Sequence, residues 1–263
     1  MNGGAGSGSL HQPAPDPTEV ATFAQARAVV LERIAQACAT AGRDPTSVRL
    51  VAVTKTVPPE RIRAAVAAGL TTLGENRVRE AEVKIDAVPG ASWHLIGPLQ
   101  SNKARRAVQT FEMIESVDSI ELAARLDRVV REDRGLEPRG PVPVHLRLAV
   151  LLQVNVDDDP AKAGFRTNDL AAAVASLGSL EALRLDGLMT IGRLAEDPEA
   201  ARPTFRRLRE LSGELRVGAP SLGPELSMGM TDDYRVAVEE GATIVRVGRA
   251  LFAARPEPAP DAQ

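Results

Sequence analysis

Apolar residues recur at helical spacing from Thr18 to about Ala41, beginning with Val20 and Phe23. This spacing predicts a long leading helix, and Gly42 supplies its stop because glycine accepts a left-handed backbone. Residues 1–17 ahead of the helix are rich in Gly, Ser and Pro. We expect them to form a disordered tail, because they offer little apolar surface to offset the entropy of ordering. A second tail is expected at residues 256–263.

Beyond the leading helix, short β-rich runs alternate with segments of helical periodicity. The runs predict eight strands at about residues 49–55, 70–74, 93–96, 111–116, 148–155, 183–190, 225–228 and 243–247. Strands that alternate with helices pair in parallel. Two helix-to-strand junctions, at residues 65–71 and 237–243, also share one pattern with a glycine stop. We therefore predict a single (β/α)8 TIM barrel over residues 18–255 with an extra N-terminal helix; an open doubly wound sheet is the alternative.

The composition excludes several classes of protein. Hydrophobic residues make up 44% and charged residues 25%, the balance of an ordinary globular protein. No apolar run reaches the roughly 20 residues of a membrane span. The net charge of -3 argues against a nucleic-acid partner, which a clustered basic surface would bind. The single cysteine, Cys38, and the absence of a secretory pattern at the start favour a cytoplasmic protein.

Ligands of a (β/α)8 barrel meet the residues at the C-terminal ends of its strands. In this chain those positions combine one amine with small polar groups and two glycine-containing corners. They are Lys55, Glu75, Asn76, Gly97, Ser116, Asn155, Met189, Thr190, Ser227, Gly248 and Arg249.

Lysine is rare in this chain. Of 32 basic residues only Lys55, Lys84, Lys103 and Lys162 are lysines, so each retained lysine raises the question of an amine that must lose its proton. Lys55 follows the apolar run 50–53, where partial desolvation would lower its pKa and favour the nucleophilic amine. The alternative is a solvent-exposed lysine that only marks a strand end.

The loops after the last two strands are candidates for a phosphate site, which barrels often hold there. The Ser227 hydroxyl, amides beside glycine and a helix start near Thr231 would donate to a dianion; alternatively, the glycines serve only as turns. Arg246 lies within the apolar strand, on the face opposite Val245 and Val247. Its charge needs a partner, either a pyridine-type ring nitrogen or a carboxylate of the protein.

No metal site is expected. Residues 157–159 are three aspartates, but they precede Pro160 and lack calcium-loop spacing, so they predict a solvated turn. His11, His94 and His145 have no partner at the spacing of zinc ligands.

Six segments together resemble a known family. They are AVTKTVP around Lys55, GENRVRE from Gly74, WHLIGPLQSNK from Trp93, VNVDDDPAKAGF from Val154, GLMTIG from Gly187 and LSMGMTDDYRVAVEEGATIVRVGRALF from Leu226. In this order, over about residues 20–253, they resemble the pyridoxal phosphate homeostasis protein family. The resemblance implies a barrel of pyridoxal 5′-phosphate (PLP) fold type III, similar to the N-terminal domain of alanine racemase, with PLP held as a Schiff base on Lys55.

The resemblance also implies a set of cofactor-binding residues: Lys55, Asn76, Met189, Ser227, Arg246, Gly248 and Arg249. Ser227, Gly248 and Arg249 would lie at the phosphate. Arg246 would face the pyridine nitrogen, and Asn76 and Met189 would lie beside the ring. Lys162 matches a second family lysine that is linked to PLP exchange.

Two positions depart from the family pattern. Arg249 stands where members usually have Ser or Thr, so its phosphate contact would come from the backbone amide or from the guanidinium. The C-terminal pattern G-A-R-x-Y is altered at residues 253–257, which leaves any role of the tail open.

The implied function is PLP homeostasis inside the cell by storage, protection or delivery of the cofactor, without catalysis. PLP-dependent apo-enzymes are candidate recipients, and a monomer or weak dimer is expected. One alternative is a PLP-dependent amino-acid racemase, which needs a second acid/base opposite the lysine. Tyr234, the only tyrosine, is predicted on a helix beyond the rim. Another alternative is an enzyme whose lysine forms imines with sugar-phosphate carbonyls, as in aldolases.

Overall fold

A computed structural model describes residues 14–193 and 195–252 of the chain. Within these residues, eight parallel strands form a closed barrel. They are β1 (Arg49–Val53), β2 (Thr72–Glu75), β3 (Ser92–Leu95), β4 (Met113–Val117), β5 (Leu148–Asn155), β7 (Leu183–Met189), β8 (Glu225–Ser227) and β9 (Ile244–Val247). Pairing of β4 with β5 and of β9 with β1 completes the ring. The predicted barrel is confirmed, and the open doubly wound sheet is wrong. The two-residue β6 (Phe165–Arg166) pairs with β5 outside the ring.

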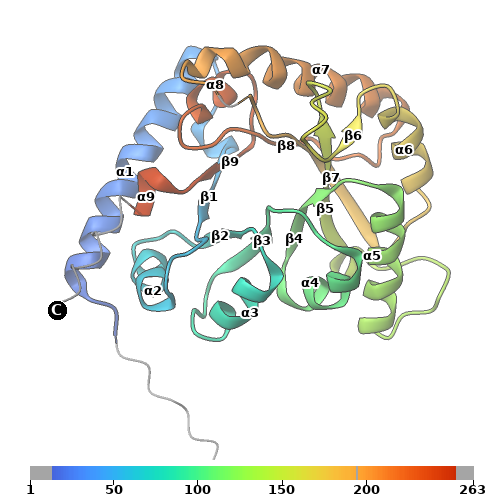
Figure 1. Cartoon of the computed structure of the whole chain (residues 1–263), viewed down its shortest axis with the longest axis horizontal. Helices are drawn as coiled ribbons and strands as arrows, with labels where there is room; N and C mark the ends of the chain where they lie inside the picture. The colour runs from blue at the N-terminus through green and yellow to red at the C-terminus, as the bar shows by residue number, and fades with distance from the viewer. Residues whose placement is uncertain (1–13, 194, 253–263) are drawn as a thin grey trace, which may run out of the picture.

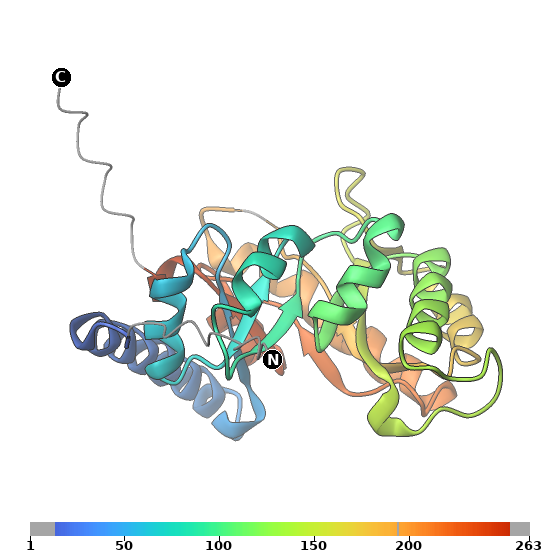
Figure 2. The same cartoon turned by 90° about the horizontal axis from the view of Figure 1, so that it is seen from below.

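Helices surround the strands in a ring, as Figure 1 shows. They are α1 (Pro17–Thr40), α2 (Pro59–Ala67), α3 (Val78–Ile85), α4 (Ala104–Thr110), α5 (Ile120–Asp133), α6 (Leu170–Leu177), α7 (Arg202–Gly218), α8 (Tyr234–Glu239) and α9 (Arg249–Phe252). Short 3-10 turns lie at Pro45–Ser47, Ser101–Lys103, Val144–Leu146 and Pro198–Ala201. The view from below places α1 and α5 at opposite ends of the molecule (Figure 2). No helix in the described parts combines the length and apolar character that crossing a bilayer requires.

The leading helix α1 is part of the outer layer and not a separate arm. It starts at Pro17, one residue before the predicted start, because proline suits the first helical turn and the Asp16 side chain caps it. It packs against α2, α8 and α9. The Phe23 ring meets the Phe252 ring of α9 edge to face, with 5.4 Å between centroids. Helix α1 thus covers the short final helix. The proposed tails fall almost wholly outside the described residues.

The two matching helix-to-strand junctions have the same geometry. Gly69 and Gly241 both adopt positive φ, at 90° and 106°. The amides that follow them donate five residues back, from Leu70 to Ala65 and from Ala242 to Ala237. This hydrogen bond is typical of a Schellman motif, and it confirms the predicted glycine stop at both junctions. The same stop explains why β2 begins at Thr72, later than predicted.

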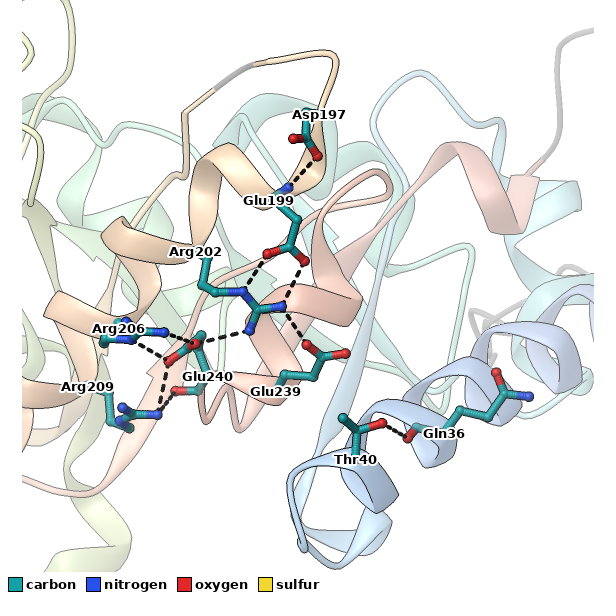
Figure 3. Close-up of polar contacts among 9 residues, drawn as sticks. All are labelled: Gln36, Thr40, Asp197, Glu199, Arg202, Arg206, Arg209, Glu239 and Glu240. Atoms are coloured by element: carbon teal, nitrogen blue, oxygen red, sulfur yellow. Dashed lines mark hydrogen bonds and ion pairs between the residues drawn. The ribbon is translucent and has the colours of Figure 1, made fainter.

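A cluster of charged residues fastens α7 to α8 beside the last two strands (Figure 3). Arg202, Arg206 and Arg209 of α7 each donate to the Glu240 carboxylate at 3.1 Å. Burial raises the pKa of Glu240, but hydrogen bonds and charge from these guanidiniums outweigh it and hold the pKa below its ordinary value. Because Glu240 is the residue directly after α8, the cluster holds the C-terminal end of that helix against α7.

Glu240→Gln is expected to lower the free energy of unfolding by about 1–3 kcal/mol at pH 7, because three guanidiniums lose their shared carboxylate. The difference from the parent should shrink as pH falls below 4.5, the ordinary value. The pKa is depressed in the folded state, so the stabilisation is complete above the unfolded value and lost as the folded carboxylate takes up a proton. Urea denaturation across pH measures both effects.

The matched control is Glu132→Gln, which removes the carboxylate of a half-exposed pair with Arg105. Its stability should change by less than about 0.5 kcal/mol. Equal losses in the two variants would contradict the role given to Glu240.

Candidate functional site

A cavity of about 570 Å³ opens at the C-terminal end of the barrel. Its lining comes from the ends or following loops of every barrel strand except β4. Five of the seven predicted cofactor-binding residues line it: Lys55, Asn76, Arg246, Gly248 and Arg249. Gly97, another predicted rim residue, lines it too. The volume is in the range of small-molecule sites, which spans roughly 300–1,000 Å³.

Lys55 lies two residues beyond β1 at the mouth of this cavity. Its side chain is exposed, which differs from the expectation of a partly buried amine. The reason is that β1 ends at Val53, so the lysine belongs to the loop and not to the strand.

A side chain of helix α3 holds the backbone just before Lys55 in place. The buried amine of Lys84, on α3, donates to the Thr54 carbonyl at 2.8 Å and to Glu75 at 2.5 Å. The Thr54 hydroxyl donates to the same Glu75 oxygen at 2.7 Å. Sequence reasoning placed Glu75 among the rim residues and assigned Lys84 no role. Successive strand residues face opposite sides, so Glu75 points outward to α3 and Asn76 lines the cavity.

A hydrogen-bonded polar layer lies inside the barrel. His94 Nδ1 is 2.7 Å from Glu115, and the Ser227 hydroxyl donates to the other Glu115 oxygen at 2.5 Å. Arg246 donates to Ser227 and, at 2.9 Å, to the Thr190 carbonyl. All four side chains are almost completely buried. Sequence reasoning missed the His94–Glu115 pair, whose members lie on the inward faces of adjacent strands.

The members of this layer shift one another's pKa values. Burial raises the pKa of Glu115, but the His94 contact, the charge of Arg246 and the Ser227 hydrogen bond bring it below the ordinary value. Burial in turn lowers the pKa of Arg246, while Glu115 and Asp233 oppose that shift. Glu115 lies 3.9 Å from the guanidinium. Arg246 therefore has the carboxylate partner considered above and also reaches the cavity.

Two of the seven predicted cofactor-binding residues do not line the cavity. Ser227 is fully buried at the end of β8, and its hydroxyl is engaged by Glu115 and Arg246. Met189 is fully buried in an apolar layer with Val51 and Ile244. Both are the last residues of their strands and point into the barrel, whereas the loops that follow reach the cavity.

The loops after β8 and β9 meet at one side of the cavity. The Gly248 amide donates to the Thr231 hydroxyl at 3.3 Å, and the Arg249 guanidinium donates to the Asp232 carboxylate. The predicted helix is present but begins later than Thr231: α8 starts at Tyr234 and has only six residues. The Asp233 carboxylate accepts from the Met230 amide, so it holds the loop and does not cap the helix.

The aspartate run is not a wholly solvated turn, which corrects the sequence prediction. Asp157 is mostly buried, accepts from Thr204 at 2.7 Å and pairs with Arg193 and Lys162. Lys162 also lines the cavity and donates to the carbonyls of residues 191 and 192 at 3.2 Å. The described residues contain no cluster of His, Cys, Asp or Glu that could hold a metal ion.

Lys84→Met is expected to lower the free energy of unfolding by about 3 kcal/mol or more, because it leaves the buried Glu75 carboxylate without its cation. Adding Glu75→Gln should recover part of the loss. Lys103→Met, which removes a lysine outside this pair, is the control and should unfold nearly as the parent does. If Lys84→Met is as stable as Lys103→Met in urea denaturation, Lys84 is dispensable for the stability of the fold.

Comparison with known proteins places these features in a family. Residues 29–256 match the alanine racemase N-terminal domain family. The pyridoxal phosphate homeostasis protein of Pseudomonas aeruginosa is 42% identical over 244 residues, 92% of this chain and 99% of that protein. The protein of the same name from Escherichia coli is 35% identical over 233 residues, 87% of this chain and 94% of its own.

Solved structures agree with this fold. PipY of Synechococcus elongatus with PLP bound is 41% identical, with a TM-score of 0.71 over 85% of this chain and 99% of its own. An alanine racemase from Corynebacterium glutamicum shares the fold alone, at 14% identity and a TM-score of 0.61, with 93% of this chain and 64% of that chain covered. The sequence matches and the closed barrel lead to one assignment: the chain belongs to the pyridoxal phosphate homeostasis protein family.

Proposed function

We propose that this chain binds PLP in the cavity and serves PLP homeostasis by storing, protecting or delivering the cofactor. One observation carries the proposal: an amine, a buried guanidinium and a glycine corner with a second guanidinium line a single cavity of suitable size. The relatives named above and the PLP-bound PipY structure support the choice of cofactor.

The cavity residues fit distinct parts of PLP. When bound, PLP would supply an aldehyde, and the Lys55 amine would hold it as a Schiff base with loss of one water molecule. Arg246, which lines the cavity, would face the pyridine nitrogen. Because a guanidinium only donates, it leaves that nitrogen unprotonated and the ring a poor electron sink. Asn76, also in the lining, would lie beside the ring.

The phosphate would bind where the loops after β8 and β9 meet. Gly248 offers a backbone amide and Arg249 a guanidinium, both at the cavity. Ser227 and Met189 act indirectly in this proposal, because neither lines the cavity. Ser227 orients Arg246, and Met189 packs in the apolar layer of the barrel interior.

The arrangement favours a carrier over a racemase. The Tyr234 hydroxyl is buried and absent from the cavity lining, so it is badly placed to move a substrate proton. The nitrogen of Lys162, the other amine of the cavity, is already engaged by Asp157 and two backbone carbonyls. PLP-dependent apo-enzymes remain the proposed recipients, with the chain as a monomer or weak dimer.

Purified protein incubated with PLP is expected to show a visible absorbance band that borohydride removes, with the reduced adduct on Lys55 by peptide mass. Lys55→Arg should lose both signals, because a guanidinium does not form the adduct. Lys103→Arg is the matched control and should keep them. A Lys55→Arg protein that retains the band would refute the assignment of the amine.

The PLP-loaded protein is expected to interconvert D- and L-alanine no faster than free PLP does, because no second acid/base is proposed in the cavity. Chiral chromatography of the alanine product measures this rate. Sustained turnover above the free-cofactor rate would restore the racemase alternative.

A further inference from the structure

Two polar contacts join the loops after β8 and β9 at the rim of the cavity. Thr231 and Asp232 supply the acceptors, and Gly248 and Arg249 supply the donors. All four residues line the cavity. The groups proposed to receive a phosphate are therefore already bonded to oxygen atoms of a neighbouring loop.

A phosphate ligand can readily replace Asp232 as the ion-pair partner of Arg249. Its side chains are 65% and 77% exposed, and an ion pair so open to water contributes little stability. A phosphate dianion offers three acceptor oxygens and charge-assisted hydrogen bonds, which are stronger than bonds between neutral groups. Arg249 thus loses little when it leaves Asp232 for such a ligand.

Other contacts hold the loop without this pair. The Met230 amide donates to the Asp233 carboxylate at 2.6 Å, and the Tyr234 amide donates to the Met230 carbonyl at 2.8 Å. The Arg246 amide donates to the Gly229 carbonyl at 3.0 Å. These contacts hold the loop without the Asp232 carboxylate.

We propose that Asp232 competes with the phosphate of the ligand for Arg249, and so sets how tightly the cavity retains a phosphorylated ligand. The competition weakens binding and speeds release, as delivery of a cofactor requires. This inference rests on the proposed function and adds to it a residue that determines affinity. Its signature is a coupling between Asp232 and Arg249 that appears only when the ligand carries a phosphate.

The test compares PLP with pyridoxal, which lacks the phosphate, by spectroscopic titration of the parent protein, Asp232→Asn, Arg249→Ala and the double variant. Asp232→Asn is expected to bind PLP about threefold more tightly and to release it more slowly, with pyridoxal binding unchanged. In the Arg249→Ala background, adding Asp232→Asn should have no effect. Glu132→Gln, which frees Arg105 from its carboxylate outside the cavity, is the control and should bind PLP as the parent does.

Two results would overturn the inference. Unchanged PLP affinity in Asp232→Asn would show that the carboxylate does not compete. A gain that persists with Arg249→Ala would show direct repulsion of the phosphate by Asp232, with no competition for the guanidinium. A parent protein that fails to bind PLP at all would reject the proposed function as well, so the two failures are distinguishable.

Discussion

The rest of the site depends on the neutralisation of a positive charge inside the barrel. Arg246 is 4% exposed, and an isolated guanidinium at that depth would destabilise the fold severely. Glu115 supplies the opposite charge, and Ser227 donates to Glu115 while it accepts from Arg246. These contacts come from three strands, so the network can form only when the barrel is closed. A fixed cation at the base of the cavity is the result.

Periodicity was sufficient to predict the barrel, because each strand and its following helix bury a regular apolar face. It also identified Lys55 and the Gly248 corner, since C-terminal strand ends converge in this fold. Periodicity did not predict the orientation of Glu75, because β2 extends one residue beyond its predicted end. That residue decides which side chain faces the cavity and which faces α3.

Ser227 shows a different limit of sequence reasoning. Its place at a strand end was predicted correctly, but the availability of its hydroxyl depends on a carboxylate 112 residues away. No local pattern specifies such a pairing, because it arises from strand register around the closed ring. His94 was passed over for the same reason: its partner lies 21 residues away on the next strand.

The contact between the first and last helices bears on how the chain completes its fold during synthesis. Strand β9 closes the ring against β1, and α9 then packs under α1 through Phe252 and Phe23. Until those final residues leave the ribosome, β1 has an unpaired edge and α1 lacks part of its packing surface. Such an edge can pair with other chains. Loss of a short C-terminal segment would therefore expose the beginning of the barrel, nearly the whole length of the sequence away.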